Sequence, residues 1–87
     1  VLTMGTLATL PAVAGTVQSK DSAAYYAELG RAEAAARKYS SAWRYLEKAA
    51  AFDARNADLH KEIAEVCFKM NRTAPAIKAL ETAVSIN

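Results

Sequence analysis

The feature that most constrains this chain is an internal repeat of 34 residues. A shift of the sequence by that length places Glu28 on Glu62, Leu29 on Ile63 and Gly30 on Ala64. Five further pairs match in size and polarity: Ala42 with Ala76, Leu46 with Leu80, Glu47 with Glu81, Ala49 with Ala83, and Phe52 with Ile86. A period of this length is typical of folds in which one supersecondary unit stacks on copies of itself.

Each unit contains the signals for two helices. Apolar residues at spacings of three and four predict helices over 23–36, 41–53, 57–70 and 74–86. Small polar residues that can cap the helix N-termini precede them, namely Asp21 and Ser22, Ser40, Asn56, and Thr73. Pro75 fits the first turn of the last helix, because amides there have no intrahelical partner. The predicted fold class is therefore all-α, with tandem antiparallel helix hairpins.

Small residues recur at fixed places in these helices. They are Gly30, Ala42 and Ala49 in the first unit, and Ala64, Ala76 and Ala83 in the second. Such residues let two helix backbones approach at the short end of the packing range of about 8 to 10 Å. We expect large side chains such as Trp43, Leu46 and Phe52 to fill the layers between the helices.

This order of residues resembles the tetratricopeptide repeat family. The first unit supplies Tyr26, Leu29, Gly30, Tyr39, Ala42, Leu46 and Ala49, and the second supplies His60, Ile63, Ala64, Ala76, Leu80 and Ala83. The resemblance implies a fragment of an α-solenoid with one repeat over 23–56 and a second over 57–87 that is truncated at its end. Glu33, Arg37 and Ala54 depart from the family pattern, which usually has an aromatic residue, Gly and Pro at these places.

The family binds extended peptides or partner helices on the concave face formed by the first helix of each hairpin. By family position, the second-repeat part of this groove would contain Asp58, Lys61, Glu62, Glu65, Phe68 and Lys69. The first-repeat part would contain Ala24, Ala27, Glu28 and Arg31. Chaperone-binding members clamp a terminal carboxylate with a Lys and Asn pair. This chain has Ala27 and Arg31 at those places in the first repeat, and Lys61 and Glu65 in the second. Neither pair reproduces the clamp. The expected partner is therefore a protein or peptide of unknown identity.

Catalytic, cofactor-binding and metal sites are not predicted. His60 and Cys67 are seven residues apart on one helix, so their backbones lie about 10 Å apart, and the pair has no orienting acid. Cys67 stands at a core position of the family, and burial is its expected role. The chain has a formal charge of +2 with both signs interspersed, which does not indicate a nucleic-acid-binding stripe.

The first 14 residues differ from the rest of the chain. Residues 1–14 carry no charge, and Pro11 is followed by the small residues "AVA" at 12–14. Small residues of this kind precede the processing site of a signal peptide. We therefore interpret residues 1–14 as a signal-peptide-like leader. Residues 15–22 would form a linker. The run is too short and too interrupted for a membrane span, which needs about 20 apolar residues. The leader predicts an exported bacterial protein of the periplasm or cell surface; the alternative is a cytoplasmic adaptor that keeps residues 1–22 as a helical cap.

The combined prediction is an interaction module or scaffold without catalytic activity of its own. The alternative is a set of accessory docking repeats in a larger enzyme whose catalytic domain lies outside these 87 residues. Two repeats are fewer than the three or so that usually make a stable stack. Ile77, Leu80, Val84 and Ile86 also have no predicted neighbour, so we expect further repeats or self-association.

Overall fold

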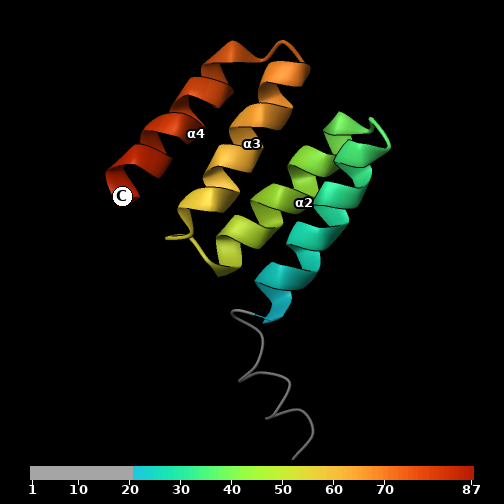
Figure 1. Cartoon of the computed structure of the whole chain (residues 1–87), viewed down its shortest axis with the longest axis horizontal. Helices are drawn as coiled ribbons and strands as arrows, with labels where there is room; N and C mark the ends of the chain where they lie inside the picture. Colours follow the sequence, from blue (N-terminus) through green and yellow to red (C-terminus); the bar gives the residue numbers. More distant parts are fainter. Residues whose placement is uncertain (1–20) are drawn as a thin grey trace, which may run out of the picture.

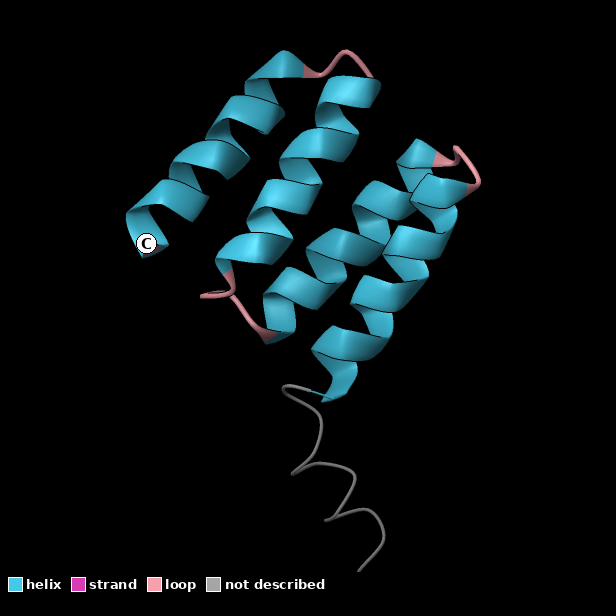
Figure 2. Cartoon of the chain, viewed as in Figure 1, coloured by secondary structure: helices cyan, strands magenta, loops and turns pink. Residues whose placement is uncertain are grey.

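The computed structural model describes residues 21–87, and this part of the chain folds into helices joined by short turns (Figures 1 and 2). The first helix covers residues 21–35 and is followed by α2 (Tyr39–Phe52), α3 (Ala57–Lys69) and α4 (Thr73–Ile86). Successive helices run antiparallel and lie side by side as two hairpins (Figure 1). Residues 21–87 contain no strand, and the predicted all-α hairpin architecture is confirmed. The predicted leader at 1–14 and most of the predicted linker at 15–22 lie outside the described residues.

Only one of the predicted helix caps is correct. The Asn56 side chain accepts a hydrogen bond from the Asp58 amide at 3.0 Å and so caps α3. Asp21 and Ser22 are already helical, and Ser40 and Thr73 lie in the first turns of α2 and α4. α2 and α4 start earlier than predicted because the turn before each of them sets its direction without a side-chain cap.

Those turns have the same backbone geometry in both hairpins. Arg37 and Asn71, which are one repeat apart, adopt left-handed φ angles of 64° and 60°. The following amides, of Lys38 and Arg72, each donate a 2.8 Å hydrogen bond to a carbonyl five residues earlier. This is the pattern that satisfies orphan carbonyls at a helix C-terminus. The left-handed conformation favours Gly and is tolerated by Asn, so Arg37 holds it at a greater cost than Asn71 does.

The small residues of the repeat lie at the helix contacts, as predicted. Ala42, Ala49, Ala76 and Ala83 are buried in equivalent places of the two hairpins. Gly30 leaves no room for a side chain, because a Cβ added there would lie 2.8 Å from Cγ of Leu46 and 3.2 Å from the Ala42 carbonyl oxygen. The chain therefore needs these small side chains to bring paired helices together.

The central position of α3 joins the two hairpins into one stack. It packs against both α2 and α4, and Leu59, Ile63 and Cys67 from α3 are buried in the shared core. Within the first hairpin, the Tyr26 ring stacks on those of Tyr45 and Phe52 with centroid distances of 6.4 and 5.9 Å. One side of α3 therefore faces the core, and the opposite side remains open beside the 21–35 helix.

Candidate functional site

The predicted groove residues of the second repeat form a stripe along α3. Asp58, Lys61, Glu65 and Phe68 are spaced by three or four residues and are all exposed, and Lys69 follows them at the end of the helix. Residues at these spacings share one side of an α-helix. The structure therefore brings these five predicted site residues together on one face.

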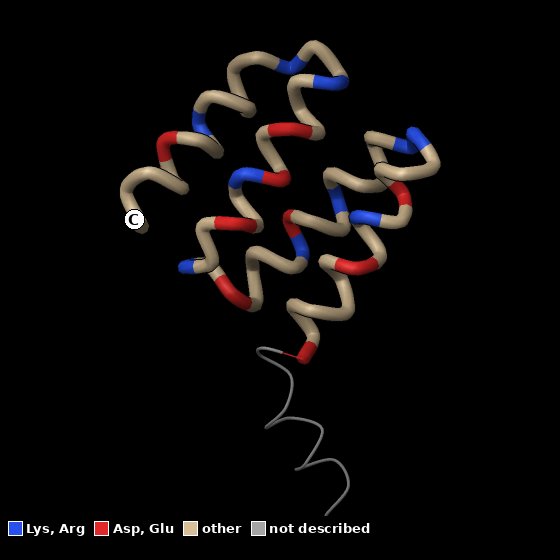
Figure 3. The backbone as a smooth tube through the Cα atoms, in the orientation of Figure 1, with Lys and Arg blue, Asp and Glu red and all other residues tan. Residues whose placement is uncertain are grey.

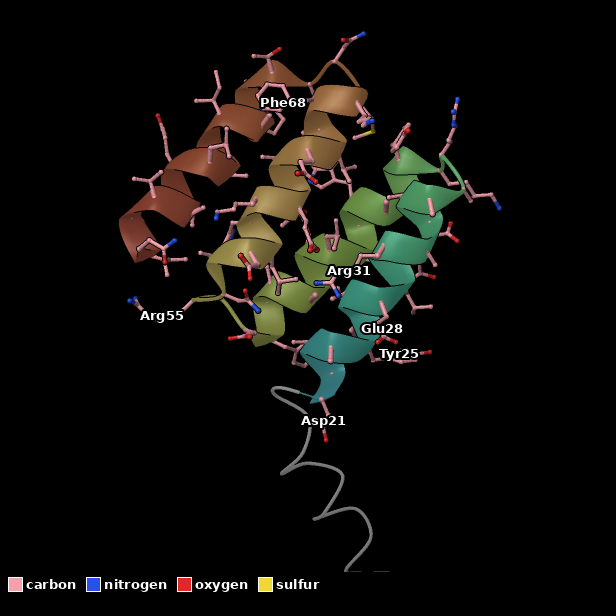
Figure 4. All side chains as sticks on the ribbon, viewed as in Figure 1. Asp21, Tyr25, Glu28, Arg31, Arg55 and Phe68 are labelled. Carbon is pink, nitrogen blue, oxygen red and sulfur yellow. The ribbon has the colours of Figure 1, made fainter. Side chains whose placement is uncertain are left out.

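Arg31 and Glu62, also predicted for the groove, bind each other. Nε of Arg31 lies 3.1 Å from both carboxylate oxygens of Glu62, and its Nη2 lies 3.1 Å from Oε2. Figure 4 shows Arg31 extending from the 21–35 helix toward α3. Because the guanidinium is about half exposed, the pair contributes at most about 1 kcal/mol, and it links the first helices of the two hairpins.

Two shallow hollows border this ion pair and the α3 stripe. The first, of about 200 Å³, has Ala24, Ala27, Glu28 and Arg31 on one side and is closed by α3 and the turn before it. The second is an open hollow of about 590 Å³ lined by Glu65, Phe68 and Lys69. Phe68 is 47% exposed there. The first-repeat residues predicted for the groove thus lie around the first hollow. Phe68, the only aromatic residue among the predicted groove residues, lies at the second.

Charges of both signs alternate along this face (Figure 3). From the N-terminus of α3 they run Asp58, Lys61, Glu65 and Lys69. Such an arrangement can pair with acidic and basic side chains of a ligand, but it does not concentrate charge of one sign. Residues 21–87 contain no group of three or more side chains that could hold a metal ion. No helix in the same described part has the length and apolar character needed to cross a membrane.

His60 and Cys67 have separate roles in the fold. Cys67 is fully buried, as predicted, and burial raises the pKa of its thiol; the nearby Glu47 carboxylate raises it further, and Arg72 acts in the opposite direction. Nε2 of His60 lies 2.8 Å from the Ala54 carbonyl oxygen, so the imidazole is held against the turn that precedes α3. The Cys67 thiol therefore packs in the core, and the His60 imidazole stabilises the turn before α3.

Comparison with protein families gives a match over most of the chain. Residues 26–87 match the family model of the tetratricopeptide repeat, and this segment includes most of the first hairpin and all of the second. The chain belongs to the tetratricopeptide repeat family. Neither the comparison with curated proteins nor that with solved structures gave a match. Tetratricopeptide repeats generally serve as protein–protein interaction modules, and the described helices have the hairpin arrangement of such a module.

Sequence reasoning missed that Arg31 and Glu62 are each other's partner. Both were assigned to the groove separately, yet their side chains meet across the junction between the two repeats. Their separation of 31 residues, three fewer than the repeat, is the available signal.

Proposed function

We propose that this chain is a protein-binding module whose groove face, formed by the 21–35 helix and α3, holds a peptide segment of a partner protein. The observation that carries the proposal is the exposed Phe68 ring between Glu65 and Lys69, at the edge of an open hollow. An exposed aromatic ring offers a large apolar area to a ligand at a small cost in side-chain entropy, and aromatic residues are frequent anchors of interfaces.

The charges along α3 indicate what such a peptide would carry. Lys61 and Lys69 can pair with carboxylates, and Asp58 and Glu65 with basic side chains. An apolar residue of the peptide would contact Phe68. The ligand is therefore expected to be a segment with mixed charge and at least one large apolar residue, held by contacts on both sides of that residue.

The proposal can be tested by selecting peptides from a random library on the 87-residue chain and measuring their affinity for two charge-reversal variants. Lys61→Glu combined with Lys69→Glu changes the groove face. Arg44→Glu combined with Arg55→Glu makes the same change in net charge on α2 and on the turn before α3, where both residues are exposed. We expect the groove variant to lose about ten-fold or more in affinity, and the control variant to bind as the original chain does. Equal losses in both variants would refute the groove as the binding site.

Export is a second part of the proposal, supported by the uncharged segment 1–14 and the small residues that end it. The protein would then act in the periplasm or at the cell surface as a non-enzymatic scaffold. N-terminal sequencing of the protein recovered from its host tests this part. A mature N-terminus near residue 15 is expected, and a protein that keeps residues 1–14 would contradict export.

A further inference from the structure

A cleft of about 350 Å³ lies between α2 and α4, and α3 forms its floor (Figure 1). Trp43, Glu47 and Ala50 form the α2 wall, and His60 and Ile63 of α3 line the floor. The α4 wall consists of residues at the same helical spacing, namely Pro75, Lys78, Ala79 and Thr82. The residues predicted for the groove do not line this cleft. It is therefore a separate site, independent of the groove face on which the proposed function rests.

The cleft is complete within the described helices. One wall belongs to the first hairpin, and the floor and the other wall belong to the second. Its volume is in the range of small-molecule sites, which is about 300 to 1,000 Å³. Trp43 and Ala50 are seven helical residues apart, so the α2 wall is about 10 Å long. Two extended peptide residues, which span about 7 Å, fit within that length.

Glu47 and Lys78 place charges of opposite sign on the two walls. Both residues are exposed, and Arg31 with Glu62 is the only ion pair within residues 21–87. Glu47 and Lys78 are therefore not paired with each other across the cleft. A ligand with an ammonium group at one end and a carboxylate at the other can pair with both walls. A ligand with a single charge would also meet a wall of like charge.

Uncharged polar groups of the lining fit an amide. Nε1 of Trp43 is buried and has no hydrogen-bond acceptor within the described residues. Nε2 of His60 donates to the Ala54 carbonyl oxygen, so Nδ1 of the neutral ring is an acceptor. The Thr82 hydroxyl donates to the Lys78 carbonyl oxygen at 3.0 Å and keeps its lone pairs as acceptors. The lining thus has donor and acceptor groups, and a peptide amide contains one of each.

The centre of the cleft is apolar. Ala50, Ile63 and Ala79 are buried members of the core cluster, one from each of the three helices that line the cleft. An apolar side chain of a ligand would be removed from water by contact with them, which favours binding. The cleft therefore combines a small apolar centre with opposite charges on its two sides.

We propose that this cleft binds a free dipeptide as a zwitterion, with its N-terminal ammonium at Glu47 and its C-terminal carboxylate at Lys78. An apolar side chain of the dipeptide contacts Ile63 at the floor, and the central amide meets the polar groups of the lining. The ligand is thus a small free peptide, whereas the groove face holds a segment of a partner protein.

Alanyl-leucine and two blocked forms of it test the charge rule. N-acetylation removes the ammonium group, and amidation of the C-terminus removes the carboxylate. Binding is followed by the fluorescence of Trp43 and by chemical-shift changes in the isotope-labelled 87-residue chain. A ligand of this size is expected to bind with a Kd of about 1 mM. We expect each blocked form to bind about three- to five-fold more weakly, with the shifts centred on Trp43, Ala50 and Ala79.

The internal repeat supplies matched control variants. Glu47→Gln should abolish the preference for a free N-terminus, and Lys78→Gln should abolish the preference for a free C-terminus. Glu81→Gln and Arg44→Gln remove the same charges one repeat away, at places that do not line the cleft, and should leave both preferences unchanged. Each preference compares two ligands on the same variant, so a change in the stability of the variant affects both affinities alike.

Three results would overturn the proposal. The first is equal affinity for the free and the blocked dipeptides, or a preference that persists in Glu47→Gln and Lys78→Gln. The second is a set of shifts centred on Phe68, which would place the dipeptide on the groove face. The third is a titration that does not approach saturation at about 20 mM dipeptide. The peptide selection proposed for the groove face depends on Lys61 and Lys69, so either proposal can fail without the other.

Discussion

The substitution Gly30→Ala tests how tightly the first hairpin is packed. Gly30 lies inside a helix, where Ala is favoured over Gly by about 1 kcal/mol. From local propensity alone, the substitution should therefore stabilise the protein. The structure predicts the opposite sign because of what the new methyl group would meet.

The structure leaves no space for the added Cβ. It would lie 2.8 Å from Cγ and 3.0 Å from Cδ2 of Leu46, and 3.2 Å from the Ala42 carbonyl oxygen. Leu46 is 1% exposed and cannot swing into solvent, and the carbonyl belongs to the α2 backbone. Overpacking of this kind costs about 1 to 3 kcal/mol, and the upper part of that range applies here because both neighbours are held. After the gain in propensity, we expect a net loss of about 1 to 2 kcal/mol in the free energy of unfolding.

Urea unfolding followed by the fluorescence of the single tryptophan, Trp43, measures this loss. Two variants calibrate it. Ala32→Gly, at an exposed position of the same helix, gives the propensity term alone and should cost about 1 kcal/mol. Ala64→Gly makes the reverse change at the equivalent place of the second hairpin and should also destabilise the chain, because it loses both propensity and a buried methyl group.

The comparison has a clear negative outcome. If Gly30→Ala raises the free energy of unfolding by the amount that Ala32→Gly lowers it, the Cβ has found space and the close contact of Gly30 with Leu46 is not a packing constraint. Destabilisation by Gly30→Ala together with stabilisation by Ala64→Gly would instead show that both hairpins are more stable with Gly at this place.

Three other predictions concern the cap, the turns and the core thiol. Asn56→Ala should lower the free energy of unfolding by about 1 kcal/mol in the same urea experiment, because the Asp58 amide loses its acceptor; no change would mean that water replaces the cap without cost. Arg37→Gly should stabilise by up to about 1 kcal/mol and Asn71→Gly by less, since both positions have left-handed φ angles and Asn tolerates them better than Arg; equal effects would contradict that difference. Burial raises the pKa of the Cys67 thiol above its usual range, so the folded state holds this proton more tightly than the unfolded state. The stability that this proton contributes is complete below the unfolded pKa and is lost as pH rises. The unfolding free energy of the original chain should therefore fall more steeply above about pH 8.5 than that of Cys67→Ala, and parallel curves would contradict the shift.

Much of the fold could be predicted from short-range patterns. The helix at 57–69 was predicted within one residue at its C-terminus, and its Asn56 cap was correct, because a polar side chain before an apolar period acts through local hydrogen bonds. Arg37 stands where the family pattern has Gly, and its left-handed φ angle explains that preference. The prediction that Ser40 and Thr73 cap α2 and α4 was wrong. A residue able to cap a helix does not do so when the turn before it sets the start of the helix.

The candidate site was predictable as a face but not as a set of contacts. The spacing of Lys61, Glu65 and Phe68 places them together on any regular helix. The sequence has no local signal that Arg31 would engage Glu62, because that contact depends on how far one hairpin is displaced from the next. Two residues predicted as free groove contacts are therefore a bridge between repeats.

The sequence by itself determined the 34-residue period, the helical hairpins and the places where only small side chains occur, because these depend on side-chain size and on the helical repeat. Tertiary structure alone decided which equivalent residues are covered. Leu46 and Leu80 occupy the same place in their hairpins, yet one is 1% and the other 38% exposed. Burial is a property of the neighbouring layer, and α3 supplies that layer for α2, whereas the outer face of α4 is exposed.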